Sequence, residues 1–205
     1  WFMEIKGVIF DLDGVIVSTD EYHYRGWKRL ADEEGIYFDR QINQRLRGVS
    51  RMASLDILLE RATCAYTPQQ KQEMAARKNG YYRRSLRDLA PDDILPGVME
   101  ILTGLKERGV KIAVGSSSRN APLILERIGL ADYFDATADG NDITSSKPDP
   151  QVFLVAAQRL GLDPAHCLVV EDAEAGVEAA LAGGMRALGV GYAAGDSRAT
   201  RTAPD

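Results

Sequence analysis

The feature that most constrains the fold is a short apolar run that ends in two acidic residues and a glycine. Residues 8–10, Val-Ile-Phe, have the composition of a strand buried in a parallel sheet covered on both faces. Asp11 and Asp13 follow where this strand ends, which is where α/β enzymes hold their reactive groups, and Gly14 closes the motif. Like charges this close require a compensating cation or hydrogen bonds, and Mg²⁺ prefers such oxygen ligands. Acidic pairs are also common in surface turns, so the motif needs support from the rest of the chain.

Length and composition allow one large domain, or a core with an inserted module. The chain has 205 residues, 45% of them hydrophobic, and a formal net charge of −5. This acidic balance argues against a nucleic-acid partner, and no apolar run approaches the ~18 residues of a membrane span. Only Cys64 and Cys167 occur, and no secretory signal is visible, so we expect a cytoplasmic protein with free thiols and no membrane partner.

The chain separates into a stretch of helical pattern and a stretch of alternating strands and helices. Residues 17–91 show no convincing strand, and Thr67-Pro68 within them is typical of a helix start. From residue 92 on, the alternation predicts a parallel sheet with helices on both faces. We therefore expect an α/β fold, with a catalytic core of residues 1–16 and 92–205 and an inserted α-helical cap domain of residues 17–91. The strands are expected at residues 8–10, 110–114, 134–138, 167–170 and 187–190.

Helices of the second stretch are predicted from apolar stripes and end signals. One begins after Pro96-Gly97 and ends at Gly109. Its apolar stripe consists of Val98, Ile101, Leu102 and Leu105. Further helices are expected at residues 121–129, 150–160 and 175–182. The tail from Gly191, rich in small and polar residues, is expected to be loosely ordered.

Polar residues follow several of the predicted strands, and the ends of parallel strands meet at one edge of a sheet. Taken singly, each position has an ordinary explanation, such as a helix cap, a surface lysine or the acidic first turn of a helix. Together they place acidic groups, hydroxyls and one lysine at the same edge, which suits Mg²⁺ and a phosphate group. These positions are Asp11 with Asp13, the segment Ser116–Asn120, Lys147 within Ser146-Lys147-Pro148, and Glu171 with Asp172.

The order and spacing of these segments resemble the haloacid dehalogenase superfamily, from residue 7 to about residue 190. The resemblance implies a Rossmann-like core and Mg²⁺-dependent phosphoryl transfer through an aspartyl-phosphate. It implies that Asp11 is the nucleophile and Asp13 the general acid/base, that Ser116 and Lys147 bind the transferring phosphate, and that Asp11, Asp13, Glu171 and Asp172 form the metal site. The dehalogenases of the superfamily lack the second acid of the motif, so Asp13 favours phosphoryl transfer over dehalogenation.

Residues of the expected cap are similar to those of a subfamily of sugar-phosphate mutases within the superfamily. The resemblance extends to the segment Arg47-Gly48-Val49-Ser50-Arg51 and, in the core, to Arg119. It implies substrate and phosphate binding by Thr19, Trp27, Arg51, Ser54, Lys78, Ser117, Ser118 and Asn120, and a catalytic role for His23 in coupling cap closure to the acid/base. Val17 and Ser18 depart from the subfamily pattern. Taken singly, Trp27 is explained as a core residue, Arg51 and Lys78 as surface charges, and His23 as a structural histidine.

A physical argument favours a mutase. Moving a phosphate from O1 to O6 of one sugar through a phosphoenzyme requires a bisphosphate intermediate, and hence a second phosphate site besides Asp11. The fork of Arg51 suits that site because it binds phosphate bidentately, and Ser118 and Asn120 could complete it. We also expect the cap to close over the site and exclude water.

The resemblance to this subfamily implies interconversion of β-D-glucose 1-phosphate and glucose 6-phosphate, with Mg²⁺ as cofactor and glucose 1,6-bisphosphate as primer. The expected partner is a small phosphosugar substrate, and the expected state is a monomer. A Mg²⁺-dependent sugar-phosphate phosphatase of the same superfamily stays open as the alternative. A catalytically silent phosphosugar-binding protein is disfavoured because Asp11 and Asp13 are both present.

Overall fold

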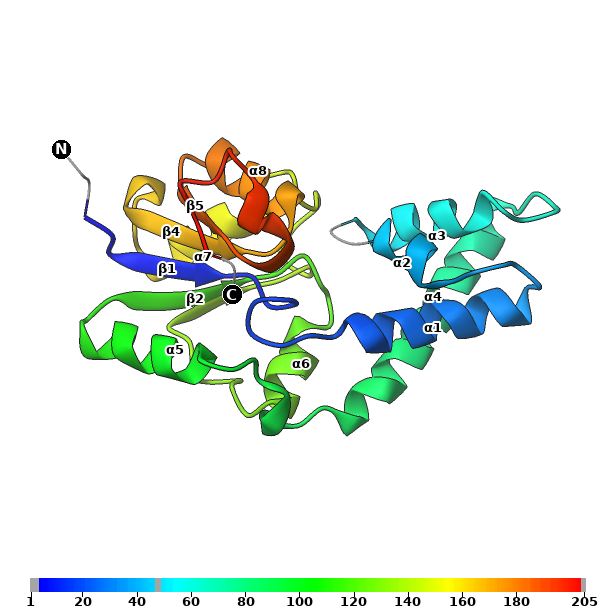
Figure 1. Ribbon diagram of the computed structural model, residues 1–205, viewed down its shortest axis with the longest axis horizontal. Helices are drawn as coiled ribbons and strands as arrows, with labels where there is room; N and C mark the ends of the chain where they lie inside the picture. The colour runs from blue at the N-terminus through cyan, green and yellow to red at the C-terminus, as the bar shows by residue number, and fades with distance from the viewer. Residues whose placement is uncertain (1–3, 47–48, 204–205) are drawn as a thin grey trace. The chain divides into compact units, whose positions relative to one another are not determined.

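The computed structural model describes residues 4–46 and 49–203, and the chain forms two compact units (Figure 1). The core unit consists of residues 1–18 and 90–205, and the cap unit consists of residues 19–89. The expected boundaries lay after residues 16 and 91. Arg47 and Gly48, which belong to the mutase-like segment, lie outside the described residues.

The core unit is built on a parallel sheet of six strands in the order β3-β2-β1-β4-β5-β6, as predicted for an α/β fold. β1 is central and pairs with β2 on one side and β4 on the other. Its side chains are all buried, which explains the continuous apolar run in the sequence. The strands are β1 (Gly7–Phe10), β2 (Lys111–Gly115), β3 (Ala136–Ala138), β4 (Cys167–Glu171), β5 (Arg186–Gly189) and β6 (Arg201–Thr202).

Helices of the core unit follow the strands in alternation and cover the sheet. α7 packs on β1, β2 and β3, while α8 packs on β4 and β5. Phe153 of α7 and Val177 of α8 are fully buried in the same apolar cluster as Ile9 of β1. The helices are α5 (Val98–Glu107), α6 (Ala121–Arg127), α7 (Gln151–Leu160) and α8 (Glu174–Ala182), and the 3-10 turns are η2 (Pro91–Asp93), η3 (Pro164–His166) and η4 (Gly191–Gly195).

The regular elements among the described residues of the cap unit are all helices, as the sequence predicted. Trp27 and Leu30 of its first helix lie in an apolar cluster with Leu55 and Met74. Thr67 caps α4 through a hydrogen bond from Gln70 N to Thr67 Oγ1 (3.2 Å), and Pro68 is the first helical residue. The elements are α1 (Asp20–Glu33), α2 (Arg40–Gln44), α3 (Arg51–Leu59), α4 (Pro68–Ser85) and the 3-10 turn η1 (Leu86–Asp88).

Two expectations for the core unit are wrong. The tail from Gly191 is not loosely ordered through its described residues 191–203, because η4 and β6 form there and β6 pairs with β5. Arg198 ties this tail to α8 through an ion pair with Glu178 (3.3 Å). In α5 the predicted stripe is incomplete, since Ile101 is 56% exposed and Leu102 is its one fully buried residue. Across the described part of the chain, none of the helices combines the length and apolar character that crossing a membrane requires.

Candidate active site in the core unit and polar cluster in the cap unit

The ends of β1 and β4 bring a lysine between two buried carboxylates. Asp11 follows β1 directly, and its backbone N–H donates to Val170 O of β4 (2.9 Å). Lys147, from the loop after β3, donates through Nζ to Asp11 Oδ1 (2.5 Å) and to Glu171 Oε1 (2.6 Å). The three side chains are at most 11% exposed. The predicted meeting of strand ends is therefore present, with the charge of Lys147 shared by two acids.

Burial and the charges of neighbouring groups together shift the pKa values in this cluster. Burial opposes the charge of Lys147, but the carboxylates of Asp11 and Glu171 outweigh it and raise the lysine's pKa. Burial raises the pKa of Glu171, against the attraction of Lys147. Burial, together with the charges of Asp11, Glu171 and Asp13, raises the pKa of Asp172 to about 8. One lysine therefore leaves the acidic group short of positive charge.

The same acids offer a donor set that fits a hard divalent cation. Oxygen atoms of Asp11, Glu171 and Asp172 lie within 4.8 Å of one another, and they are the kind of ligand that Mg²⁺ prefers. A cation there would also relieve the repulsion that raises the pKa of Asp172. Among the described residues Asp13 is not part of this group, and its role as a fourth metal ligand stays a prediction.

The position after the two acids of the opening motif requires glycine for a steric reason. Gly14 adopts a φ of 85°, and a Cβ on this residue would lie 2.2 Å from Oδ2 of Asp172. A side chain at this position would therefore be strained and would displace the carboxylate. The Gly14 N–H donates to Val17 O (2.8 Å), which turns the chain back beside the half-buried Asp13. The motif thus combines two acids with the space that a third requires.

The segment Ser116–Asn120, named here the phosphate loop for its predicted role, continues from β2 at the same edge of the sheet. Ser116 and Asn120 are buried, and the Oγ of Ser116 accepts a hydrogen bond from Ser118 N (3.2 Å). Ser118 Oγ accepts one from Asn120 N (3.1 Å). The Oγ of Ser117 is buried without a hydrogen-bond partner. An orphaned buried hydroxyl is costly, so this loop has unused capacity to bind a polar ligand.

In the cap unit, α1 and α4 bring together His23, Trp27, Lys78 and Tyr82. Lys78, only 2% exposed, places Nζ 2.8 Å from His23 Nδ1 and 4.6 Å from the centre of the Trp27 ring. An ammonium group only donates, so Nδ1 accepts and the neutral ring carries its proton on Nε2. Burial, reinforced by the charges of Lys78 and Arg51, holds the pKa of His23 well below its usual range. His23 is therefore neutral at pH 7.

Other predicted residues of the cap unit lie at element ends or within its core. Thr19 precedes α1, is fully buried, and accepts a hydrogen bond at Oγ1 from Tyr82 Oη (3.1 Å). Arg51 is the first residue of α3 and is half-buried, whereas Ser54 one turn later is buried. Sequence reasoning missed Tyr82, although its spacing of four residues from Lys78 on α4 is the signal of a shared helix face.

Sequence and structure comparisons agree on the same group of proteins. A family model described as haloacid dehalogenase-like hydrolase matches residues 5–184. The chain is 48% identical to a β-phosphoglucomutase of Bacillus subtilis, covering 91% of this chain and 84% of the relative. It is 31% identical to a phosphorylated carbohydrates phosphatase of Thermotoga maritima, covering 95% and 89%. A crystal structure of β-phosphoglucomutase from Clostridium difficile superposes with a TM-score of 0.90 at 38% identity, covering 97% of this chain and 90% of that one.

Proposed function

The chain belongs to the haloacid dehalogenase-like hydrolase family, and from this premise we propose that it is a β-phosphoglucomutase. The reaction is the interconversion of β-D-glucose 1-phosphate and glucose 6-phosphate. The observation that carries the choice of a mutase is the similarity to the Bacillus subtilis enzyme, which exceeds that to the phosphatase relative by a wide margin. The group of Asp11, Lys147, Glu171 and Asp172 supplies the chemistry that such a transfer requires.

Asp11 is proposed as the nucleophile that accepts the phosphoryl group. Its carboxylate is held by Lys147, whose positive charge lowers the repulsion between a carboxylate and an approaching phosphate. Ser116 is proposed to donate to the transferring phosphate, with Ser117, Ser118 and Asn120 as further contacts of the phosphate loop. Mg²⁺, when bound by Asp11, Glu171 and Asp172, neutralises charge on the phosphoryl oxygens.

Asp13 is proposed as the general acid/base. It protonates the leaving sugar oxygen while the phosphoryl group moves from the sugar to Asp11. It deprotonates the sugar hydroxyl that attacks the aspartyl-phosphate in the opposite transfer. The phosphoryl group thus moves first to the sugar, giving glucose 1,6-bisphosphate, and the other phosphate then returns to Asp11. This cycle begins only with a phosphorylated Asp11, so a trace of the bisphosphate serves as primer.

Residues of the cap unit are proposed to bind and orient the sugar phosphate. Arg51 suits the phosphate that is not reacting, because a guanidinium binds phosphate through two parallel donors. His23 offers a neutral ring with its proton on Nε2, a hydrogen-bond donor that does not change charge near pH 7. Thr19, Trp27, Ser54 and Lys78 are proposed as further substrate contacts. We also expect a monomeric enzyme of the cytoplasm, which sedimentation and cell fractionation would test.

The deciding experiment is incubation of the protein with β-glucose 1-phosphate, Mg²⁺ and a trace of glucose 1,6-bisphosphate. A mutase forms glucose 6-phosphate without inorganic phosphate. Stoichiometric release of phosphate would instead support the phosphatase reaction known for the Thermotoga maritima relative. Asp11→Ala should abolish turnover, and turnover that persisted would remove Asp11 from the mechanism.

The role of Arg51 is tested separately from the nucleophile. Arg51→Ala should lower mutase flux by roughly 100-fold or more, because a lost bidentate charge contact and a misplaced substrate both raise the barrier. Phosphorylation of Asp11 by acetyl phosphate should persist in this variant. Arg83→Ala, which removes an exposed arginine of α4, is the matched control and should leave flux unchanged. Unchanged flux in Arg51→Ala would exclude Arg51 from substrate binding.

A further inference from the structure

A second loop of the core unit packs backbone to backbone against the phosphate loop. It comprises residues 139–142 after β3 and is named here the support loop. Gly140 makes the close approach possible, since a Cβ there would lie 2.4 Å from Ser117 O and 2.7 Å from Arg119 N. Hydrogen bonds at this junction run from Ser116 N to Ala138 O (3.0 Å), from Gly140 N to Ser118 O (3.2 Å), from Asn141 Nδ2 to Arg119 O (3.2 Å) and from Arg119 Nε to Gly140 O (3.2 Å).

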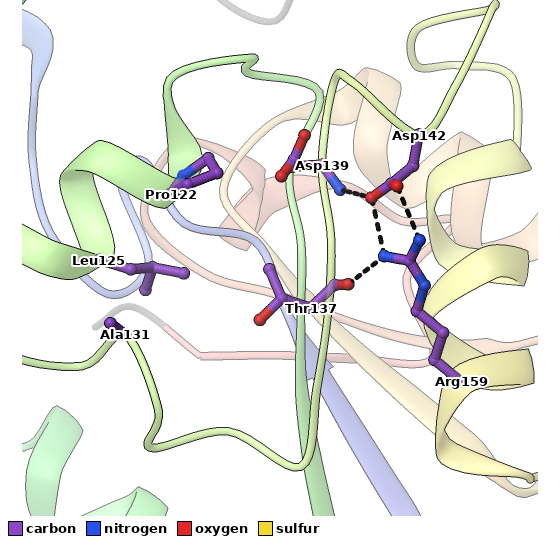
Figure 2. Close-up of a pocket in the computed structure, with 7 residues that line it drawn as sticks. All are labelled: Pro122, Leu125, Ala131, Thr137, Asp139, Asp142 and Arg159. Carbon is purple, nitrogen blue, oxygen red and sulfur yellow. Dashed lines mark hydrogen bonds and ion pairs between the residues drawn. The ribbon is translucent and has the colours of Figure 1, made fainter.

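The support loop is itself anchored to α7 by one ion pair, between Asp142 and Arg159 (Figure 2). Arg159 donates through Nη1 to Asp142 Oδ2 (2.8 Å) and through Nη2 to Asp142 Oδ1 (2.7 Å). Nη1 also donates to Thr137 O of β3. Asp142 Oδ2 in turn accepts from Asp139 N (2.9 Å), and Asp139 Oδ1 accepts from Asn141 N (2.7 Å). A continuous chain of contacts therefore joins α7 to the phosphate loop.

The ion pair between Asp142 and Arg159 contributes more to the position of the support loop than to the stability of the fold. It borders a pocket of about 300 Å³ whose lining includes Pro122, Leu125 and Thr137 (Figure 2), and its side chains are 44% and 25% exposed. Exposed ion pairs contribute little to the stability of a protein, because water screens their attraction. A bidentate pair nevertheless restrains the direction of both side chains, which is what an anchored loop requires.

We propose that Arg159 is a positioning residue for phosphate binding, acting through Asp142 and the support loop on Ser116 and Ser118. Its own side-chain hydrogen bonds go to Asp142 and Thr137, so its effect on phosphate is indirect. Its guanidinium holds Asp142, Asp142 orients the backbone of the support loop, and that backbone holds the phosphate loop in the conformation that presents its donors. The inference rests on the proposed assignment of the loop Ser116–Asn120 to phosphate.

The test compares Arg159→Gln with a matched control, Arg198→Gln. Arg198 is also 44% exposed, lies in the same unit, and donates through Nη2 to Asp196 at the same 2.7 Å, far along the chain from the phosphate loop. Arg159→Gln should weaken binding of inorganic phosphate in the presence of Mg²⁺ about tenfold, the effect of misplacing one or two hydrogen bonds. Arg198→Gln should leave that affinity unchanged, with a similar small change in melting temperature.

Hydrogen exchange distinguishes a positioning role from a merely stabilising one, because a residue that only stabilises the fold would not change the exchange rate at this junction specifically. The Gly140 amide donates across the junction to Ser118 O, so its exchange should accelerate in Arg159→Gln and not in Arg198→Gln. Arg159→Lys, which keeps the charge but loses the fork, should fall between wild type and Arg159→Gln in phosphate affinity. Asp142→Asn gives an independent variant, and combining it with Arg159→Gln should add little because both act through one contact.

The outcomes separate this proposal from the proposed function. If wild type forms glucose 6-phosphate and Arg159→Gln binds phosphate as tightly as Arg198→Gln, the positioning role is wrong and the mutase assignment stands. If wild type binds phosphate but forms no glucose 6-phosphate, the mutase assignment is wrong, while weaker binding in Arg159→Gln still supports the positioning role. Should Arg159→Gln fail to fold, Asp142→Asn decides the matter by the same two measurements.

Discussion

At the scale of single residues, the core site is defined by an imbalance of charge. Asp11 and Glu171 share one cation, Lys147. Asp172 lies beside them, and among the described residues it forms no ion pair of its own. Burial, together with the neighbouring negative charges, raises the pKa of Asp172 to about 8, so without a metal this carboxyl holds a proton at neutral pH. Binding of a divalent cation therefore has to displace a proton.

Magnesium binding should accordingly depend on pH. Below pH 8 the apparent dissociation constant of Mg²⁺ should rise about tenfold per pH unit, because metal and proton compete for Asp172. The folded-state pKa lies above the unfolded value of 3.8, so Asp172 binds more protons in the folded state. Its contribution to stability in the metal-free protein is therefore lost as pH rises from 3.8 to about 8. Thermal melts at pH 6 and pH 9 should show the larger gain from Mg²⁺ at pH 9, and Asp172→Asn should remove the difference.

Removing the lysine should expose the cost of the buried carboxylates. Lys147→Met should lower the free energy of unfolding of the metal-free protein by about 3 kcal/mol at pH 8, the cost of breaking a buried ion pair. The loss should shrink as the pH is lowered to 5, because burial raises the pKa of Glu171 and so favours its protonation. Urea titration measures both values. Lys71→Met breaks the exposed pair with Asp56 and should cost about 1 kcal/mol or less, so equal losses in the two variants would contradict this account.

At the scale of elements, local signals that satisfy the backbone were predictable from the sequence. Thr67-Pro68 begins α4 as expected, because a side-chain acceptor and a fixed φ act within a few residues. The strand β6 was not predictable, since Arg201 and Thr202 carry no apolar pattern and are ordered by pairing with β5. The exposure of Ile101 was missed for a similar reason. Periodicity indicates which face of α5 is apolar, but not how much of that face the neighbouring elements cover.

The capping box of α4 gives a prediction at this scale. Thr67→Ala removes the acceptor for Gln70 N and should destabilise the protein by about 1 kcal/mol. Thr67→Ser keeps a hydroxyl in the same place and should retain most of the stability. Chemical denaturation of both variants beside wild type measures the difference. An alanine variant as stable as the serine variant would show that the cap contributes nothing to α4.

At the scale of the whole molecule, the two units were predictable to different degrees. The core part of the site follows from a general rule, because the ends of parallel strands bring Asp11 and Glu171 to one edge, where the loop after β3 adds Lys147. No such rule applies to the helices of the cap unit. The approach of His23 to Lys78 depends on how α1 packs on α4. The sequence singled out these two residues through resemblance to a known subfamily, but it did not predict that they meet.

The division into units also predicts where a metal acts. All three candidate ligands belong to the core unit, so Mg²⁺ alone should slow hydrogen exchange near the ends of β1 and β4. Amides of the cap unit, such as that of Gln70, should exchange at unchanged rates. Exchange measured peptide by peptide with and without Mg²⁺ tests this, and equal slowing in both units would contradict it.

The insertion of the cap unit after β1 in the chain has a consequence for biosynthesis. β1 leaves the ribosome well before its neighbours, because β2 and β4 begin only at Lys111 and Cys167. At roughly 5–20 residues per second, the nascent chain carries an unpaired apolar strand for several seconds. The stretch 19–89 is contiguous and complete before either neighbour exists, so it is free to acquire structure first. Translation speed and chaperone shielding of β1 should then govern the yield of active enzyme.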